Sequence, residues 1–172
     1  MKSVLISGGT GLIGKKLSQK LKNKGYEVNI LSRSKNSNSA FKTFLWDVNK
    51  KEIDLEAIRI ADYIIHLAGA GIAEKRWTEA RKKVIIDSRV ESGNLLFNAV
   101  KSNPNQLKAF ISASAIGYYG AITTKHIFSE SDPHHDDFLG ETCAVWEESA
   151  NQFESIGIRT VKIRTGLVLS KE

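Results

Sequence analysis

Short apolar runs alternate along the chain with longer segments in which apolar residues recur every three or four positions. The short runs predict six strands, at residues 3–7, 26–32, 41–46, 63–67, 107–112 and 158–169. The longer segments predict helices at residues 12–24, 55–60, 78 to about 102, and 139–155. This alternation predicts an α/β fold, a Rossmann-type doubly wound parallel sheet with helices on both faces. Right-handed crossovers favour the strand order 3-2-1-4-5-6.

A glycine-rich stretch, SGGTGLIG at residues 7–14, follows the first predicted strand and opens the first predicted helix. It fits G-x-x-G-x-x-G with Gly8, Gly11 and Gly14, and also G-x-G-x-x-G with Gly9 as the first glycine. Glycines in this context allow a tight turn and a close approach of the backbone to a pyrophosphate, and the helix N-terminus offers free N–H groups. The stretch therefore predicts a dinucleotide-binding loop.

The end of the second predicted strand indicates which dinucleotide is bound. Sites for NAD usually carry an acidic residue there, which holds the ribose 2′-hydroxyl. This chain reads LSRSK instead, and the Arg33 guanidinium can pair with a 2′-phosphate, with Ser34 and Lys35 as possible helpers. We therefore predict NADP(H) over NAD(H). The alternative is that Arg33 is a solvated loop arginine.

Two further strand ends suggest contacts to the same ligand. Asp47, at the end of the third strand, is a candidate acceptor for an adenine amino group, and the alternative is an aspartate that caps a turn. Ala68 and Gly69, after the fourth strand, are small enough for a nicotinamide ribose to lie against the backbone. His66, inside that strand, is expected to be a hydrogen-bonded core residue.

Composition adds few constraints. The net charge of +6 is spread over helical faces interleaved with apolar positions, which favours a phosphate-bearing small ligand over nucleic acid. No apolar run approaches the roughly 20 residues that span a membrane, so no membrane partner is expected. The single cysteine, Cys143, cannot form an internal disulfide, and a cytoplasmic location is the expectation. The run HHDD at 134–137 is not expected to bind metal, because adjacent ligands rarely converge on one ion.

Several segments together resemble a known superfamily: SGGTGLIG, LSRS, LAGAGIAEKRWTEARKKVIIDSRVESGNLL, SASAIGYYG, FLGETCAVWE and IRTGLVLS. They resemble the extended short-chain dehydrogenases/reductases, a group that includes the NAD-dependent epimerase/dehydratase-like proteins. The resemblance is closer to an atypical "epimerase family protein" branch, whose members look NADP-binding. The resemblance implies a cofactor-binding role for the phosphate loop, for the 2′-phosphate arginine and for the nicotinamide loop. The matching positions are Ser7, Gly8, Gly11, Leu12, Ile13, Gly14, Arg33, Ala68 and Gly69.

The resemblance also identifies catalytic candidates and one departure. Ser114 lies at or next to the active-site hydroxyl of the superfamily, and the alternative is a serine that caps a turn. The Tyr-x-x-x-Lys pair of the superfamily is absent, because Leu139 and Cys143 stand at the aligned positions and neither replaces the original group. Tyr118 and Tyr119 are candidates for the lost tyrosine, and Tyr119, water or a cofactor hydroxyl would relay the proton. The alternative is that both tyrosines pack the loop against the sheet.

The combined expectation is an NADP(H)-binding oxidoreductase or epimerase-like protein acting on a small hydroxyl or carbonyl substrate, such as a nucleotide-sugar-like molecule. The alternative is a dinucleotide-binding module without turnover, or a redox sensor. Residues 1–172 are expected to form the dinucleotide-binding domain. The C-terminal substrate domain of the extended members is expected to be absent from this chain, which makes turnover by the fragment doubtful.

Overall fold

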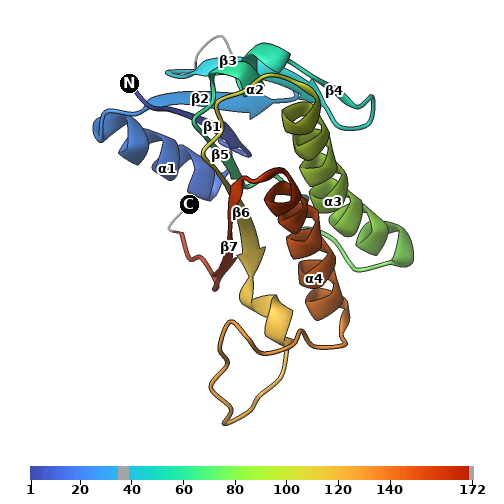
Figure 1. Cartoon of the computed structure of the whole chain (residues 1–172). Coiled ribbons are helices and arrows are strands. Elements are labelled where there is room, and N and C mark those ends of the chain that lie inside the picture. The colour runs from blue at the N-terminus through green and yellow to red at the C-terminus, as the bar shows by residue number, and fades with distance from the viewer. Residues whose placement is uncertain (35–38, 171–172) are drawn as a thin grey trace.

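The computed structural model describes residues 1–34 and 39–170, and its centre is one seven-stranded sheet with the order β4-β3-β2-β1-β5-β6-β7 (Figure 1). The strands are β1 (Ser3–Ser7), β2 (Glu27–Ser32), β3 (Lys42–Asp47), β4 (Glu52–Ile53), β5 (Tyr63–His66), β6 (Ala109–Ala115) and β7 (Arg159–Thr165). The helices are α1 (Leu12–Asn23), α2 (Leu55–Ile60), α3 (Glu79–Ser102) and α4 (Phe138–Asn151), with 3₁₀ turns η1 (Ile116–Tyr119) and η2 (Gln152–Ile156).

The predicted fold class is confirmed. The six predicted strands are parallel and follow the order 3-2-1-4-5-6. The sheet differs in one detail, the edge strand β4, which pairs antiparallel with β3 through Trp46 and Ile53. A strand of two residues is too short to show an alternating pattern, so periodicity gave no signal for it.

Some predicted boundaries shift. The strand predicted to end at 112 continues to Ala115 as β6, and the strand predicted to reach 169 ends at Thr165, before Gly166. Leu167 and Leu169 lie beyond it and are 93% and 91% exposed. The apolar side chains of these two leucines led to the longer predicted strand, but both are exposed in the structure and lie outside the sheet.

Two apolar layers hold the sheet to its helices. The larger layer lies between the sheet and α2, α3 and α4, and its centre is the stacked pair Phe110 and Phe153, with ring centroids 3.8 Å apart. The smaller layer lies between the sheet and α1 on the opposite face, where Leu17 and Leu21 pack against the buried side chains of β1 and β2 (Figure 1). The central strands are thus buried on both faces, as parallel strands usually are. Within the described residues, no helix is both long and apolar enough to cross a membrane.

Replacement of Phe153 by alanine tests the larger layer. Because Phe153 is completely buried against Phe97 and Phe110, we expect Phe153→Ala to lower the free energy of unfolding by about 3–5 kcal/mol. Urea denaturation followed by circular dichroism measures the change. The control Ile127→Ala removes a side chain that is 90% exposed and should change stability by less than about 0.5 kcal/mol. Equal effects of the two substitutions would contradict this assignment of the core.

Candidate functional site

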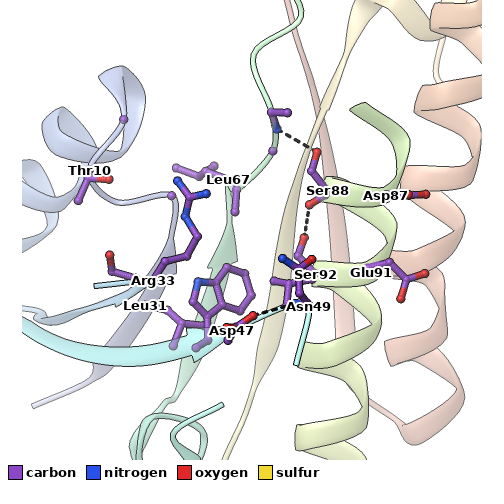
Figure 2. A pocket seen from close by; sticks show the side chains of 18 of the residues that line it. Thr10, Leu31, Arg33, Asp47, Asn49, Leu67, Asp87, Ser88, Glu91 and Ser92 are labelled. Carbon is purple, nitrogen blue, oxygen red and sulfur yellow. Dashed lines mark hydrogen bonds between the residues drawn. The ribbon is translucent and has the colours of Figure 1, made fainter. Parts of the chain in front are cut away.

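A cleft of about 1060 Å³ opens at the carboxyl ends of β1, β2, β3 and β5 (Figure 2). One wall is formed by the loop after β1, the end of β2 and the turn after β3, and the other by the loop after β5 and by α3. The residues that line it are Gly8, Thr10, Gly11, Leu31–Ser34, Trp46–Asn49, Lys51, Leu67–Ala70, Val84, Asp87, Ser88, Glu91 and Ser92. The four strand ends therefore meet where a doubly wound sheet is expected to bind its ligand.

The glycine loop can take its shape only because its glycines lack side chains. Gly8 has a φ of +71°, and a Cβ there would lie 2.8 Å from the carbonyl carbon of Leu67. A Cβ on Gly14 would collide with the carbonyl oxygen of Gly8, so α1 starts directly against the loop. Gly11 is the N-cap of α1 and supplies no side-chain hydrogen bond, which leaves first-turn N–H groups without a side-chain cap at this end of the helix.

The ten predicted cofactor residues fall into two groups. Six line the cleft: Gly8, Gly11, Arg33, Asp47, Ala68 and Gly69. Four lie outside its lining: Ser7, Leu12, Ile13 and Gly14. Ser7 is 1% exposed and faces the interior, whereas Leu12 and Ile13 are 38% and 42% exposed on the first turn of α1. Their binding roles stay predictions.

Arg33 stands at the mouth of the cleft. Its side chain extends into the cavity from the end of β2, toward Leu67 (Figure 2). Among the hydrogen bonds and ion pairs between described residues, none joins Arg33 to an acidic group. Lys35, the predicted helper, lies outside the described residues, whereas Ser34 lines the cleft. As far as residues 1–34 and 39–170 show, the Arg33 guanidinium is available to an anionic ligand.

Asp47 performs the alternative task that its position suggested. Its Oδ1 accepts hydrogen bonds from the backbone N–H groups of Asn49 and Lys50, at 3.0 and 3.1 Å, and so shapes the turn after β3. Asp47 also lines the cleft, so the turn role does not remove it from the site. Its contact with adenine stays a prediction.

Ser114, the candidate catalytic hydroxyl, is not among the residues that line the cleft. It is 1% exposed and donates a hydrogen bond of 2.6 Å to Oε1 of Glu147 on α4. Glu147 also receives a fork of hydrogen bonds from Arg164, Nε to Oε1 at 2.8 Å and Nη2 to Oε2 at 2.9 Å. Burial by itself would raise the pKa of Glu147, but the hydrogen bonds from Arg164 and Ser114 outweigh burial and lower it. Glu147 is thus a paired carboxylate.

Tyr119, the second catalytic candidate, is also engaged. Its hydroxyl accepts a hydrogen bond from Nη1 of Arg164 at 2.7 Å and donates one to the carbonyl of Ser129 at 2.8 Å. Its ring stacks on Phe128 at 4.7 Å, and the Arg164 guanidinium lies 3.5 Å from the centroid of Tyr118. These contacts show that both tyrosines pack within the loop. The catalytic roles of Ser114 and Tyr119 stay predictions.

The two positions aligned with the missing Tyr-Lys pair do face the SASAIGYYG segment. A Cβ on Gly117 would lie 3.4 Å from Cβ of Leu139 and 3.9 Å from Sγ of Cys143. Burial raises the pKa of the Cys143 thiol. By the resemblance, an apolar side chain and a neutral thiol stand at the positions where the superfamily has its proton-transferring pair.

The residues of α3 that line the far wall were not among the predicted cofactor residues: Val84, Asp87, Ser88, Glu91 and Ser92. Ser88 and Ser92 line the cleft from α3, and Ser88 Oγ accepts a hydrogen bond from the backbone N–H of Ala70 at 2.9 Å. Arg89 is buried behind them, donates to the carbonyl of Ala70 at 3.1 Å and lies 4.9 Å from the ring of Trp146. The i, i+4 spacing of Ser88 and Ser92 places two hydroxyls on one helix face, and that pattern was available in the sequence.

Comparisons with known proteins agree with this geometry. The model of the NAD dependent epimerase/dehydratase family matches residues 4–145. Epimerase family protein SH2119 of Staphylococcus haemolyticus is 35% identical over 175 residues, which is 100% of this chain and 57% of that protein. The crystal structure of the human epimerase family protein SDR39U1 (isoform2) with NADPH is similar, with a TM-score of 0.80 and 29% identity, over 99% of this chain and 55% of that one.

A nucleoside-diphosphate sugar epimerase from Corynebacterium glutamicum is also similar, with a TM-score of 0.82 and 34% identity, over 98% of this chain and 34% of that chain. The chain belongs to the NAD dependent epimerase/dehydratase family. It spans a little over half the length of the curated relatives it matches, 57% of the Staphylococcus haemolyticus protein.

The paired state of Glu147 predicts a pH dependence of stability. A carboxylate whose pKa is lowered on folding stabilises the protein above its unfolded pKa, and this contribution is lost as the pH falls through the folded pKa. For Glu147 we expect the loss to set in below about pH 4.5, the ordinary value of a glutamate. Glu147→Gln should lower stability at pH 7 by about 3–5 kcal/mol, because it leaves Arg164 unpaired, and should flatten the decline in acid.

Urea titrations of wild type and Glu147→Gln from pH 7 to pH 3 measure both effects. Glu148→Gln is the matched control, since Glu148 is the exposed neighbour on the same helix and should keep the wild-type profile. If wild type and Glu147→Gln declined in parallel, Glu147 would not carry the proposed share of the acid sensitivity.

Proposed function

We propose that this chain is the NADP(H)-binding domain of an oxidoreductase or epimerase-like protein of the extended short-chain dehydrogenase/reductase type. The observation that carries the proposal is Arg33, a guanidinium without an acidic partner among the described residues, at the mouth of a cleft built from four strand ends. A 2′-phosphate is the ligand group that such a position favours. The bound NADPH of the human relative supports the same choice.

The cleft has a part for each piece of the dinucleotide. The glycine loop and the N-terminus of α1 would bind the pyrophosphate through backbone N–H groups. Arg33 and Ser34 would bind the 2′-phosphate, and the turn at Asp47 would flank the adenine. Ala68 and Gly69 would let the nicotinamide ribose lie against the chain. When bound, the cofactor would supply hydride transfer to or from a carbon that bears an oxygen.

Ser114 would hold the substrate oxygen and Tyr119 would relay the proton. The two hydroxyls belong to one hydrogen-bonded path through Glu147 and Arg164, which supports their acting together. Both lie outside the lining of the cleft, so contact with a substrate would require their hydrogen bonds to Glu147 and Arg164 to open. The substrate would be a small molecule with a hydroxyl or carbonyl group, and a nucleotide sugar is the class named for the Corynebacterium glutamicum relative.

Residues 1–172 would form the dinucleotide-binding domain, and a substrate domain would belong to the part of the relatives that this chain does not match. The unpaired thiol of Cys143 fits a reducing compartment such as the cytoplasm.

A second candidate is a dinucleotide-binding module or redox sensor without turnover. The observation that favours it is that Leu139 and Cys143 face the SASAIGYYG segment. These are the two positions that align with the Tyr-Lys pair of the superfamily. The hydroxyls of Ser114 and Tyr119 also favour this candidate, because both are already hydrogen-bonded within the protein.

Arg33→Ala tests the choice of cofactor. Loss of one charge-assisted hydrogen bond removes about 1.5–3 kcal/mol, so we expect NADPH to bind about tenfold to a hundredfold more weakly while NADH binding stays the same. Isothermal titration with each dinucleotide measures both constants. Arg59→Ala is the control, since Arg59 pairs with Glu56 on α2 and does not line the cleft. An unchanged ratio of NADPH to NADH affinity in Arg33→Ala would remove the basis for NADP(H).

Ser114→Ala tests turnover. If the protein is an enzyme, a screen for NADPH oxidation over carbonyl substrates should detect activity that Ser114→Ala loses, because the substrate oxygen loses its partner. Ser131→Ala, in an exposed loop, is the control and should keep the activity. Tight NADPH binding with no turnover, including in a chain extended to the length of its relatives, would favour the module.

A further inference from the structure

His66, at the end of β5, is completely enclosed beneath the cleft. It is 1% exposed and lies between the rings of Trp46 and Phe110, with centroids 6.4 and 6.0 Å away. Burial lowers its pKa to about 4, and the nearby positive charge of Arg89 acts in the same direction. The ring is therefore neutral at physiological pH and carries a single N–H.

Both ring nitrogens have hydroxyl partners from different walls of the cleft. Nδ1 lies 2.6 Å from Oγ of Ser7, the last residue of β1. Nε2 lies 3.1 Å from Oγ of Ser92, which lines the cleft from α3. Ser7 directly precedes Gly8, where the glycine loop turns, so the imidazole bridges the loop and the helix.

The direction of each hydrogen bond follows from Ser92. Its Oγ lies 2.7 Å from the carbonyl oxygen of Ser88 and 3.1 Å from that of Arg89. Because carbonyl oxygens can only accept, the single hydroxyl proton of Ser92 is donated to them. The Ser92 oxygen therefore accepts the hydrogen bond that it shares with His66. The N–H of the imidazole is then on Nε2. Nδ1 carries no proton and accepts the hydroxyl proton of Ser7.

We propose that His66, as the Nε2–H tautomer, is a positioning residue that sets the spacing between the glycine loop and α3 for the cofactor. The inference rests on the proposed dinucleotide site. The loop after β5 joins the same unit, since Ser88 Oγ accepts the backbone N–H of Ala70. The neutral ring thus links the glycine loop to α3, and the hydrogen bond between Ser88 and Ala70 links α3 to the loop after β5. Direct contact between His66 and the cofactor is not part of the role.

The tautomer is tested without any ligand. Long-range ¹H–¹⁵N correlation spectra of the ¹⁵N-labelled chain at pH 7 should show His66 with a protonated Nε2 and a bare Nδ1. The spectrum of His66→Gln identifies its signals by their loss. A protonated Nδ1, or a ring doubly protonated at pH 7, would overturn the assignment.

The positioning role is tested by NADPH titration. His66→Phe keeps an aromatic ring between Trp46 and Phe110 but breaks both bridges, and we expect NADPH to bind about tenfold more weakly. His66→Gln, which can keep the donor toward Ser92, should recover part of that loss. Ser7→Ala should weaken binding in the wild-type background and have no further effect in His66→Phe, because the bridge is already broken. His134→Phe, an exposed histidine outside the cleft, is the matched control and should bind as wild type.

Each failure has its own signature. A folded His66→Phe with unchanged NADPH affinity, or additive effects of Ser7→Ala and His66→Phe, would overturn the positioning role while the cofactor site stands. A wild-type chain that binds neither NADPH nor NADH would overturn the proposed function and the positioning role together. Circular dichroism and urea denaturation of every variant separate a weakened site from an unfolded protein.

Discussion

The cleft depends on a backbone contact between the ends of β1 and β5. Gly8 turns with a positive φ, and a Cβ on it would lie within 2.9 Å of backbone atoms of Leu67 and Ala68. The strands pair up to that point, since Ser7 is in register with His66 and the N–H of Leu67 bonds to the carbonyl of Ser7. Any side chain at Gly8 would push the two loops apart. The loops after β1 and β5 can therefore approach closely enough to form the cleft only because residue 8 has no Cβ.

Among the described residues, three buried polar groups are neutral or held by partners, whereas the charged Arg33 at the mouth of the cleft has no acidic partner. His66 is neutral because burial lowers its pKa, and Glu147 is paired with Arg164. Arg89 is held by backbone carbonyls, and burial lowers its pKa as well. Arg33 differs from these three groups, since it is exposed and its charge faces the cavity. A low-dielectric floor with a cation at the rim favours an anion at the rim and backbone contacts below it.

The residue types at the predicted strand ends were sufficient to predict part of the cleft lining. The glycine spacing and the arginine after β2 placed Gly8, Gly11 and Arg33 correctly at the cleft, because strand ends of a parallel sheet must converge. The wall formed by α3 was missed. Ser88 and Ser92 are distant in sequence from the strand ends, and their proximity to the loop after β5 is set by packing of a long helix. The two-residue β4 was missed because its pairing comes from the turn at Asp47 rather than from a pattern of its own.

Ser114 shows how one boundary can change the interpretation of a site. With a strand ending at 112, Ser114 lies in a loop and is free to face the ligand. In the structure β6 continues to Ala115, and strand alternation then places Ser114 on the same face as Phe110, toward α4. The same alternation turns Ala115, which has no hydroxyl, to the opposite face. A catalytic role for Ser114 therefore requires the pairing with Glu147 to open, and the two hydrogen bonds from Arg164 to Glu147 resist the opening. The cleft proposed for the cofactor is open, whereas the two hydroxyls proposed for proton transfer are engaged in hydrogen bonds within the protein.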